Sequence, residues 1–249
     1  MSGENELKAL EIKGLSFGYN SAHEVVKNLS FSVDFGGVTG LIGPNGSGKS
    51  TLIRLSGDLI KPRLGKITVC GNLSTTKEAK KDSILLASND YLPEFLTGLE
   101  YLRFIHNMYG MQCDMFEVQR LFSRYQMDHR WDDLIEDYSH GMRKKVQLIA
   151  AIMVARPLTM IDETPNGIDI EALYNFEVDI RNMVCEKNGV LLCTHNFSML
   201  ERIADHIALM SHGEILVYEE CRALVSKYGS IDAFVKANIP QLGGEGSEY

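Results

Sequence analysis

The sequence predicts an α/β fold, and three observations support that prediction. Residues 43–50 read G-P-N-G-S-G-K-S and lie between the apolar run Val38–Ile42 and a helix-like segment at 50–59. Further short apolar runs follow, as expected for strands buried on both faces of a largely parallel sheet. Between these runs, residues 93–154 carry apolar side chains at helical spacing. We therefore expect an α/β core with an inserted helical segment.

The glycine-rich motif has the chemistry of a phosphate-binding loop. It matches G-x-x-x-x-G-K-[ST], whose glycines let backbone N–H groups face inward at the positive end of a helix. Lys49 would reach the outer phosphates, and Ser50 would ligate magnesium. The residues expected to surround the nucleotide phosphates are Gly43, Pro44, Asn45, Gly46, Ser47, Gly48, Lys49, Ser50 and Thr51. The sequence therefore predicts binding of ATP or GTP.

An antiparallel β region is expected before this loop. Apolar residues alternate at strand spacing over residues 10–19 and again over 29–35. The apolar runs after the loop supply the remaining strand candidates, at residues 66–70, 83–87, 158–161, 190–193, 207–210 and 215–218.

Composition narrows the class of protein. The 249 residues are 45% hydrophobic and 23% charged, as in ordinary globular proteins, and the formal net charge of -8 argues against a nucleic-acid partner. Five scattered cysteines without C-x-x-C spacing indicate reduced thiols in the cytoplasm. No run approaches the roughly 20 apolar residues of a membrane span. Any membrane spans would therefore come from another polypeptide.

Two acidic residues end one of the predicted core strands. Asp162 and Glu163 follow the apolar run 158–161, at the strand end where α/β proteins place their sites. Asp162 is suited to holding magnesium through its water shell, and Glu163 to polarising an attacking water. His195 follows the strand candidate 190–193, so its imidazole is expected near the same crevice, donating to the γ-phosphate.

The segment Tyr138–Met142 reads Y-S-H-G-M and comes after the phosphate loop and just before the acidic strand. In that order it corresponds to the signature motif, commonly L-S-G-G-Q, of ABC transporters. The chain resembles their nucleotide-binding subunit from about residue 7 to 218, and is most similar to the cassettes of ABC-2 type exporters.

The resemblance implies a RecA-like P-loop NTPase core with an N-terminal antiparallel β region and a helical signature subdomain. It implies one ABC ATPase domain over residues 1–239. The α/β core would comprise 1–87 and 155–239, and the helical subdomain about 88–154. The polar, glycine-rich residues 240–249 are expected to form a disordered tail.

The resemblance also implies roles for individual residues. Tyr19 would stack on adenine, and Asp169 would belong to a loop that crosses a dimer interface. Ser139 and Gly141 would contact the γ-phosphate held by the loop of a second cassette, in a homodimer or a heterodimer. A polytopic transmembrane permease would complete the assembly at the inner face of the cell membrane.

The sequence departs from the family pattern at three places: after the strand 83–87, in the signature segment, and in the inverted order of Thr164 and Pro165. A Gln is usual after the strand 83–87, where this chain has Ser88, Asn89 and Asp90. Asn89, through its amide oxygen, or Ser88, through its hydroxyl, is the candidate for the magnesium contact there. His140 and Met142 differ from the common signature. Since Lys49, Asp162, Glu163 and His195 are all present, hydrolysis of ATP is still expected.

The leading hypothesis is an ATPase subunit that powers a membrane exporter by ATP-dependent dimerisation and hydrolysis. The alternative is a soluble ABC ATPase without transport, of the cofactor-assembly type. A P-loop kinase is disfavoured, because the signature segment and His195 would then have no task. The basic run Arg143–Lys145 begins a helix with an apolar opposite face, so it is predicted to form a solvated helix face.

Overall fold

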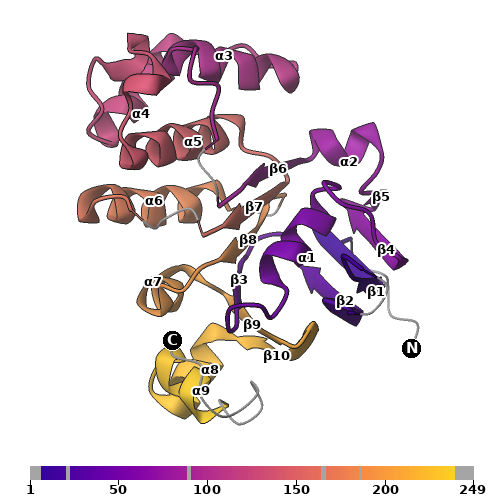
Figure 1. Ribbon diagram of the computed structural model, residues 1–249. Coiled ribbons are helices and arrows are strands. Elements are labelled where there is room, and N and C mark those ends of the chain that lie inside the picture. Colours follow the sequence, from indigo (N-terminus) through magenta and orange to yellow (C-terminus); the bar gives the residue numbers. More distant parts are fainter. Residues whose placement is uncertain (1–6, 21–22, 89–90, 164–166, 185–186, 239–249) are drawn as a thin grey trace.

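The computed structural model describes residues 7–20, 23–88, 91–163, 167–184 and 187–238. Two sheets lie side by side, with helices around them (Figure 1). Asn89 and the predicted tail 240–249 lie outside the described residues. The α/β fold predicted from the sequence is confirmed.

The larger sheet carries the phosphate loop and has the strand order β10-β9-β3-β8-β7-β6. Its strands are β3 (Val38–Ile42), β6 (Ser83–Leu86), β7 (Leu158–Asp162), β8 (Gly189–Cys193), β9 (His206–Ser211) and β10 (Glu214–Glu220). Neighbouring strands from β9 to β6 are parallel, and β10 pairs with β9 in antiparallel fashion. The carboxyl ends of β3, β7 and β8 therefore lie at one edge of the sheet.

The smaller sheet is antiparallel and has the order β2-β1-β4-β5. Its strands are β1 (Leu10–Phe17), β2 (Val26–Val33), β4 (Leu64–Val69) and β5 (Asn72–Leu73). Alternation predicted β1 and β2, and the strand candidate at 66–70 predicted β4. Strand β5 has two residues, too few to show any periodicity.

Helices lie in several of the connections between strands and after the last strand. They are α1 (Lys49–Ser56), α2 (Lys77–Lys81), α3 (Gly98–Met108), α4 (Met115–Arg124), α5 (His140–Val154), α6 (Ile170–Met183), α7 (Phe197–Ile203), α8 (Cys221–Tyr228) and α9 (Ile231–Ala237), with 3₁₀ turns η1 (Arg130–Asp132) and η2 (Ile135–Asp137). Helix α3 begins with a capping box, in which Thr97 and Glu100 each bond to the other's backbone N–H. Residues 98–154 form the inserted helical segment, which contains α3, α4 and α5.

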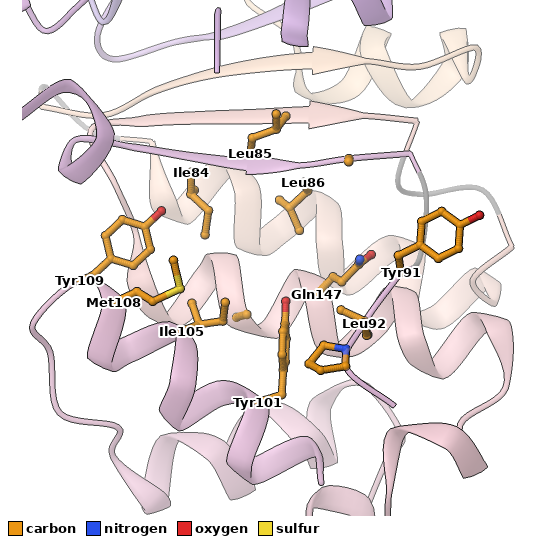
Figure 2. A pocket seen from close by; sticks show the side chains of 13 residues that line it. Ile84, Leu85, Leu86, Tyr91, Leu92, Tyr101, Ile105, Met108, Tyr109 and Gln147 are labelled. Carbon is orange, nitrogen blue, oxygen red and sulfur yellow. The ribbon is translucent and has the colours of Figure 1, made fainter. Parts of the chain in front are cut away.

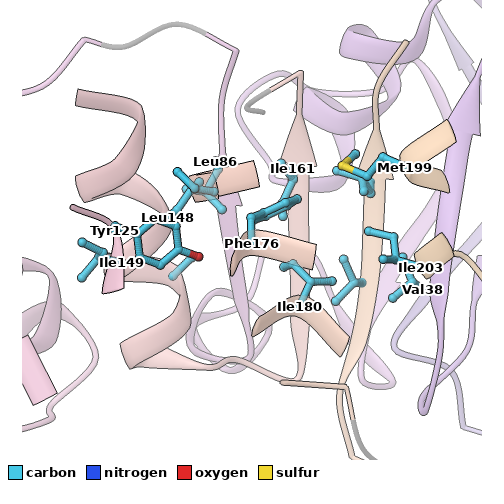
Figure 3. Close-up of a cluster of buried hydrophobic side chains, with 14 of the residues drawn as sticks. Val38, Leu86, Tyr125, Leu148, Ile149, Ile161, Phe176, Ile180, Met199 and Ile203 are labelled. Atoms are coloured by element: carbon cyan, nitrogen blue, oxygen red, sulfur yellow. The ribbon is translucent and has the colours of Figure 1, made fainter. Parts of the chain in front are cut away.

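Side chains of the parallel strands alternate between two hydrophobic cores. On β8, Leu191 and Cys193 face the core shared with α1 and the small sheet, whereas Val190 and Leu192 face the core under α5, α6 and α7. Figure 3 shows the second core, where Phe176 of α6 lies beside Ile161 of β7, and Met199 and Ile203 of α7 belong to the same cluster. This core continues into the inserted helical segment, which is thus packed directly on the sheet.

Within the described ranges, no helix is both long enough and apolar enough to cross a bilayer.

Candidate nucleotide-binding site

The phosphate loop joins β3 to α1 and depends on its glycines. Gly43 has φ 152° and Gly48 has φ 107°, in the region that favours glycine. A Cβ on Gly43 would lie 2.0 Å from the carbonyl oxygen of Met210, and one on Gly48 would lie 2.9 Å from that of Val25. The loop can therefore take this tight course only without side chains at these two positions.

Lys49 is buried and curls back over the loop. Its Nζ donates to the carbonyl oxygens of Gly43, at 2.7 Å, and of Pro44, at 3.0 Å. Gly48 caps α1 without a side-chain hydrogen bond, so the first N–H groups of the helix are not occupied by a capping side chain. The loop thus combines an ammonium group with a helix N-terminus, the arrangement that binds phosphate.

Asp162 ends β7 beside the loop. The Ser50 hydroxyl donates to Asp162 Oδ1 at 3.3 Å, which brings two of the predicted magnesium ligands together. Burial of Asp162 raises the pKa of its carboxyl above the ordinary value, and the neighbouring charge of Glu163 acts in the same direction, while the Ser50 bond opposes both. A cation at this position would offset that desolvation.

Glu163 turns out of the sheet in a left-handed conformation, with φ 55°. Its N–H donates to the carbonyl oxygen of Cys193 at 2.9 Å, which fixes the turn to the end of β8. Glu163 Oε1 lies 3.3 Å from Nε2 of His195, and both side chains are partly exposed. The predicted catalytic pair is therefore in contact at the carboxyl edge of the sheet.

One pocket lies over the phosphate loop. It is lined by Tyr19, Val25, Asn45, Gly46, Gly48, Lys49, Ser50, Thr51 and Glu163. Tyr19 stands at its side with 62% of its surface exposed, and its hydroxyl lies 3.3 Å from Thr51 Oγ1. An exposed ring held at a phosphate pocket is suited to stacking on a base.

The signature segment lies at the start of α5, and Ser139 and Gly141 do not line this pocket. Ser139 caps α5, and its Oγ accepts the Met142 N–H at 3.3 Å. A Cβ on Gly141 would lie 3.0 Å from the carbonyl oxygen of Gly167. Asp169, at the start of α6, accepts the Ala172 N–H at 2.9 Å and pairs with Lys145 at 2.6 Å.

The basic run at the start of α5 corrects one prediction, since it is not a solvated helix face. Lys144 is 2% exposed and Lys145 is 6% exposed. Lys144 Nζ donates to the carbonyl oxygen of Ser88, while Arg143 Nη1 pairs with Glu94 at 2.5 Å. The prediction was wrong because all these partners lie far along the chain, where helical periodicity gives no information.

A second pocket lies between β6 and the inserted helical segment. Figure 2 shows Tyr101 of α3 pointing toward Leu86 of β6, with Ile105 opposite Ile84 and Tyr91 at one end. The other lining residues are Ile84, Leu85, Ala87, Leu92, Pro93, Met108, Tyr109, Gln147 and Ala150. Burial raises the pKa of Tyr101 to about 12. This pocket is mainly apolar and is separate from the phosphate loop.

Comparison with known proteins agrees with this geometry. The sequence model described as ABC transporter matches residues 26–166, more than half of the chain. The chain belongs to the ABC transporter family. It is 31% identical to the ABC transporter ATP-binding protein YdbJ of Bacillus subtilis (strain 168), over 92% of this chain and 73% of that protein. It is 30% identical to the daunorubicin/doxorubicin resistance ATP-binding protein DrrA of Streptomyces peucetius, over 90% and 68% respectively.

A solved ATP-binding subunit of an ABC transporter superposes with a TM-score of 0.82 and 28% identity, covering 92% of this chain and 98% of that one. The prediction of an ABC transporter ATP-binding subunit, similar to exporter cassettes and with a P-loop NTPase core, is confirmed. The roles of individual residues stay predictions.

Proposed function

We propose that the chain binds and hydrolyses ATP with Mg²⁺ and thereby powers an ABC exporter. The main support for the proposal is that Lys49, Ser50 and Glu163 line the same pocket. Asp162 Oδ1 lies 3.3 Å from the Ser50 hydroxyl. Lys49 and Ser50 begin helix α1, and Asp162 and Glu163 stand at the end of strand β7. Their meeting supplies a phosphate cradle, a cation site and a base in one place.

The donor set fits magnesium. A serine hydroxyl and a buried carboxylate are hard oxygen ligands, and Mg²⁺ commonly takes one or two carboxylates beside substrate phosphates. Ser50 and Asp162 would hold the ion. When bound, Mg²⁺ neutralises charge on the phosphate oxygens. Asn89, the other predicted ligand, lies outside the described residues.

The loop and Lys49 hold the phosphates, and Glu163 accepts a proton from the attacking water. The water oxygen bonds to the γ-phosphorus as the bond from phosphorus to the ADP oxygen breaks, which gives ADP and phosphate. His195, at 3.3 Å, orients the Glu163 carboxylate and can donate to the γ-phosphate.

The placement of the signature segment supports a two-chain enzyme. Ser139 and Gly141 lie away from the loop pocket of their own chain, so they are available to a nucleotide held by another. A second cassette, identical or different, would receive these residues against its own phosphate loop. ATP would then favour the closed pair, and hydrolysis would release it.

The names of two relatives support export as the function. DrrA is a drug-resistance protein, and the Nod factor export ATP-binding protein I of Rhizobium sp. (strain N33) is 28% identical. These names favour export over cofactor assembly. We propose that a permease docks a cytoplasmic segment in the apolar pocket of Figure 2, at the inner face of the membrane.

Substitution of Glu163 tests the proposal. Glu163→Gln removes the base but keeps the shape, so turnover should fall at least 100-fold. ATP binding should persist, and a dimer should accumulate in ATP. Turnover is measured by phosphate release and dimer formation by light scattering. Unchanged turnover would remove Glu163 from its role.

A further inference from the structure

We infer that Lys145 and Asp169 form a positioning pair, which holds the signature segment and the start of α6 together as one surface for the second cassette. The inference rests on the proposed function and refines the role of Asp169. Neither residue lines the pocket over the phosphate loop. Their effect on catalysis would therefore pass through Ser139 and Gly141.

The carboxylate of Asp169 is engaged within its own chain. Oδ1 accepts the Ala172 N–H at 2.9 Å, and Oδ2 lies 2.6 Å from Lys145 Nζ. Each oxygen thus already has a partner from α5 or α6. This use favours a positioning role over direct contact with a nucleotide on a second chain.

Lys145 is suited to holding a loop. It is 6% exposed and comes four residues after Gly141, on the first turns of α5. A buried ammonium needs a charged partner, because an unpaired one is strongly destabilising. Lys145 therefore ties α6 to the helix that begins with the signature segment, and the two helices run side by side in Figure 1.

The backbones of the two segments are in close contact beside this ion pair. Gly141 approaches the Gly167 carbonyl so closely that a Cβ would lie at 3.0 Å. Gly167 has φ 90°, and a Cβ there would lie 3.1 Å from the ring of His140. The departure of His140 from the common signature thus places a ring against the segment that the ion pair holds.

The ion pair would affect the reaction through the position of Ser139. Ser139 is the N-cap of α5, so its position depends on where that helix begins relative to α6. Without the ion pair, the two segments could separate, while the phosphate loop stays intact. The chain should then bind ATP normally as a monomer and close poorly on a second copy.

The experiment uses the full chain in the Glu163→Gln background. Lys145→Met removes the charge and keeps much of the apolar stem, and Lys145→Arg restores the charge. Asp169→Asn removes the charge but keeps a side chain that caps a helix equally well. Lys236→Met is the matched control, because Lys236 pairs with Asp232 at 2.6 Å on α9, where both are exposed.

Three readouts are compared: ATP affinity of the monomer, ATP-dependent dimerisation by light scattering, and thermal unfolding. Lys145→Met and Asp169→Asn should weaken dimerisation about tenfold, as expected for a charged hydrogen bond whose Lys145 partner is buried, with ATP affinity unchanged. Lys145→Arg should recover most of it, and Lys236→Met should behave like the parent.

The inference would be overturned if Lys145→Met and Asp169→Asn both dimerised with an affinity within twofold of that of the parent. So would equal losses of ATP affinity and dimerisation, which would indicate a purely structural role. Should Lys145→Met fail to fold, Asp169→Asn decides between these outcomes. Absence of an ATP-dependent dimer in the Glu163→Gln parent would refute the proposed dimer itself, and this inference with it.

Discussion

The inserted helical segment meets the rest of the chain along two borders with different chemistry. The α6 border, where α4 and α5 lie on α6, has an apolar core and, beside it, a group of directional polar bonds. Arg124 Nε donates to both oxygens of Asp179, at 3.0 and 2.9 Å, and the Tyr125 hydroxyl donates to one of them at 3.1 Å. Asn175 adds a bond to the Arg124 carbonyl oxygen at 2.7 Å.

The β6 border is the apolar pocket of Figure 2, between β6, α3 and α5. Tyr109 crosses it, donating to the Ser83 carbonyl oxygen at 2.8 Å, and Lys144 reaches Ser88. Apolar contacts are not directional, whereas paired charges require one geometry. We therefore expect the α6 border to fix the inserted segment and the β6 border to adapt to a docked partner.

The largest effect on stability is predicted for a substitution that removes the polar bonds of the α6 border. Asp179→Ala leaves Arg124 and the buried Tyr125 hydroxyl without their shared acceptor, so the free energy of unfolding should fall by about 2–3 kcal/mol. Urea denaturation measures it. Asp232→Ala is the control, since its exposed pair with Lys236 is worth about 0.5 kcal/mol or less. Equal losses in the two variants would contradict the comparison.

A smaller effect concerns pH at the same border. Burial opposes ionisation of Asp169, but the Lys145 pair and the Ala172 N–H outweigh it, and the pKa lies below its ordinary value of 3.8. A lowered folded-state pKa stabilises the protein above 3.8, and this contribution is lost as pH falls through the folded pKa. The stability difference between the wild type and Asp169→Asn should therefore narrow below pH 3.8. A constant difference down to pH 3 would show that the ion pair contributes nothing.

The smallest effect on stability is expected at the β6 border. Tyr91 is 88% exposed at the pocket, so Tyr91→Ala should change the free energy of unfolding by less than about 0.5 kcal/mol. It should nevertheless reduce recovery of the permease in detergent purification. Tyr174→Ala, an exposed tyrosine on α6, is the matched control. Equal permease recovery with both variants would remove the pocket from docking.

The sequence predicted those parts of the structure that are determined by residues close together in the chain. The motif at 43–50 specifies its own backbone, and short apolar runs predicted the strands that place Asp162, Glu163 and His195 at one edge. What it could not predict is pairing between distant residues. Lys145 has the periodicity of a surface position, and only the fold brings Asp169 to it. The Arg124 and Asp179 pair likewise joins residues 55 apart.

Helix α6 holds the inserted helical segment at two places, through Asp169 at its start and through Asp179 further along. Ten residues of helix separate these places by about 15 Å. A body held at one point can still pivot about it, whereas a second point removes that freedom. A force applied to α3 in the pocket of Figure 2 would therefore move the signature segment and α6 together. The inserted helical segment would not rotate by itself.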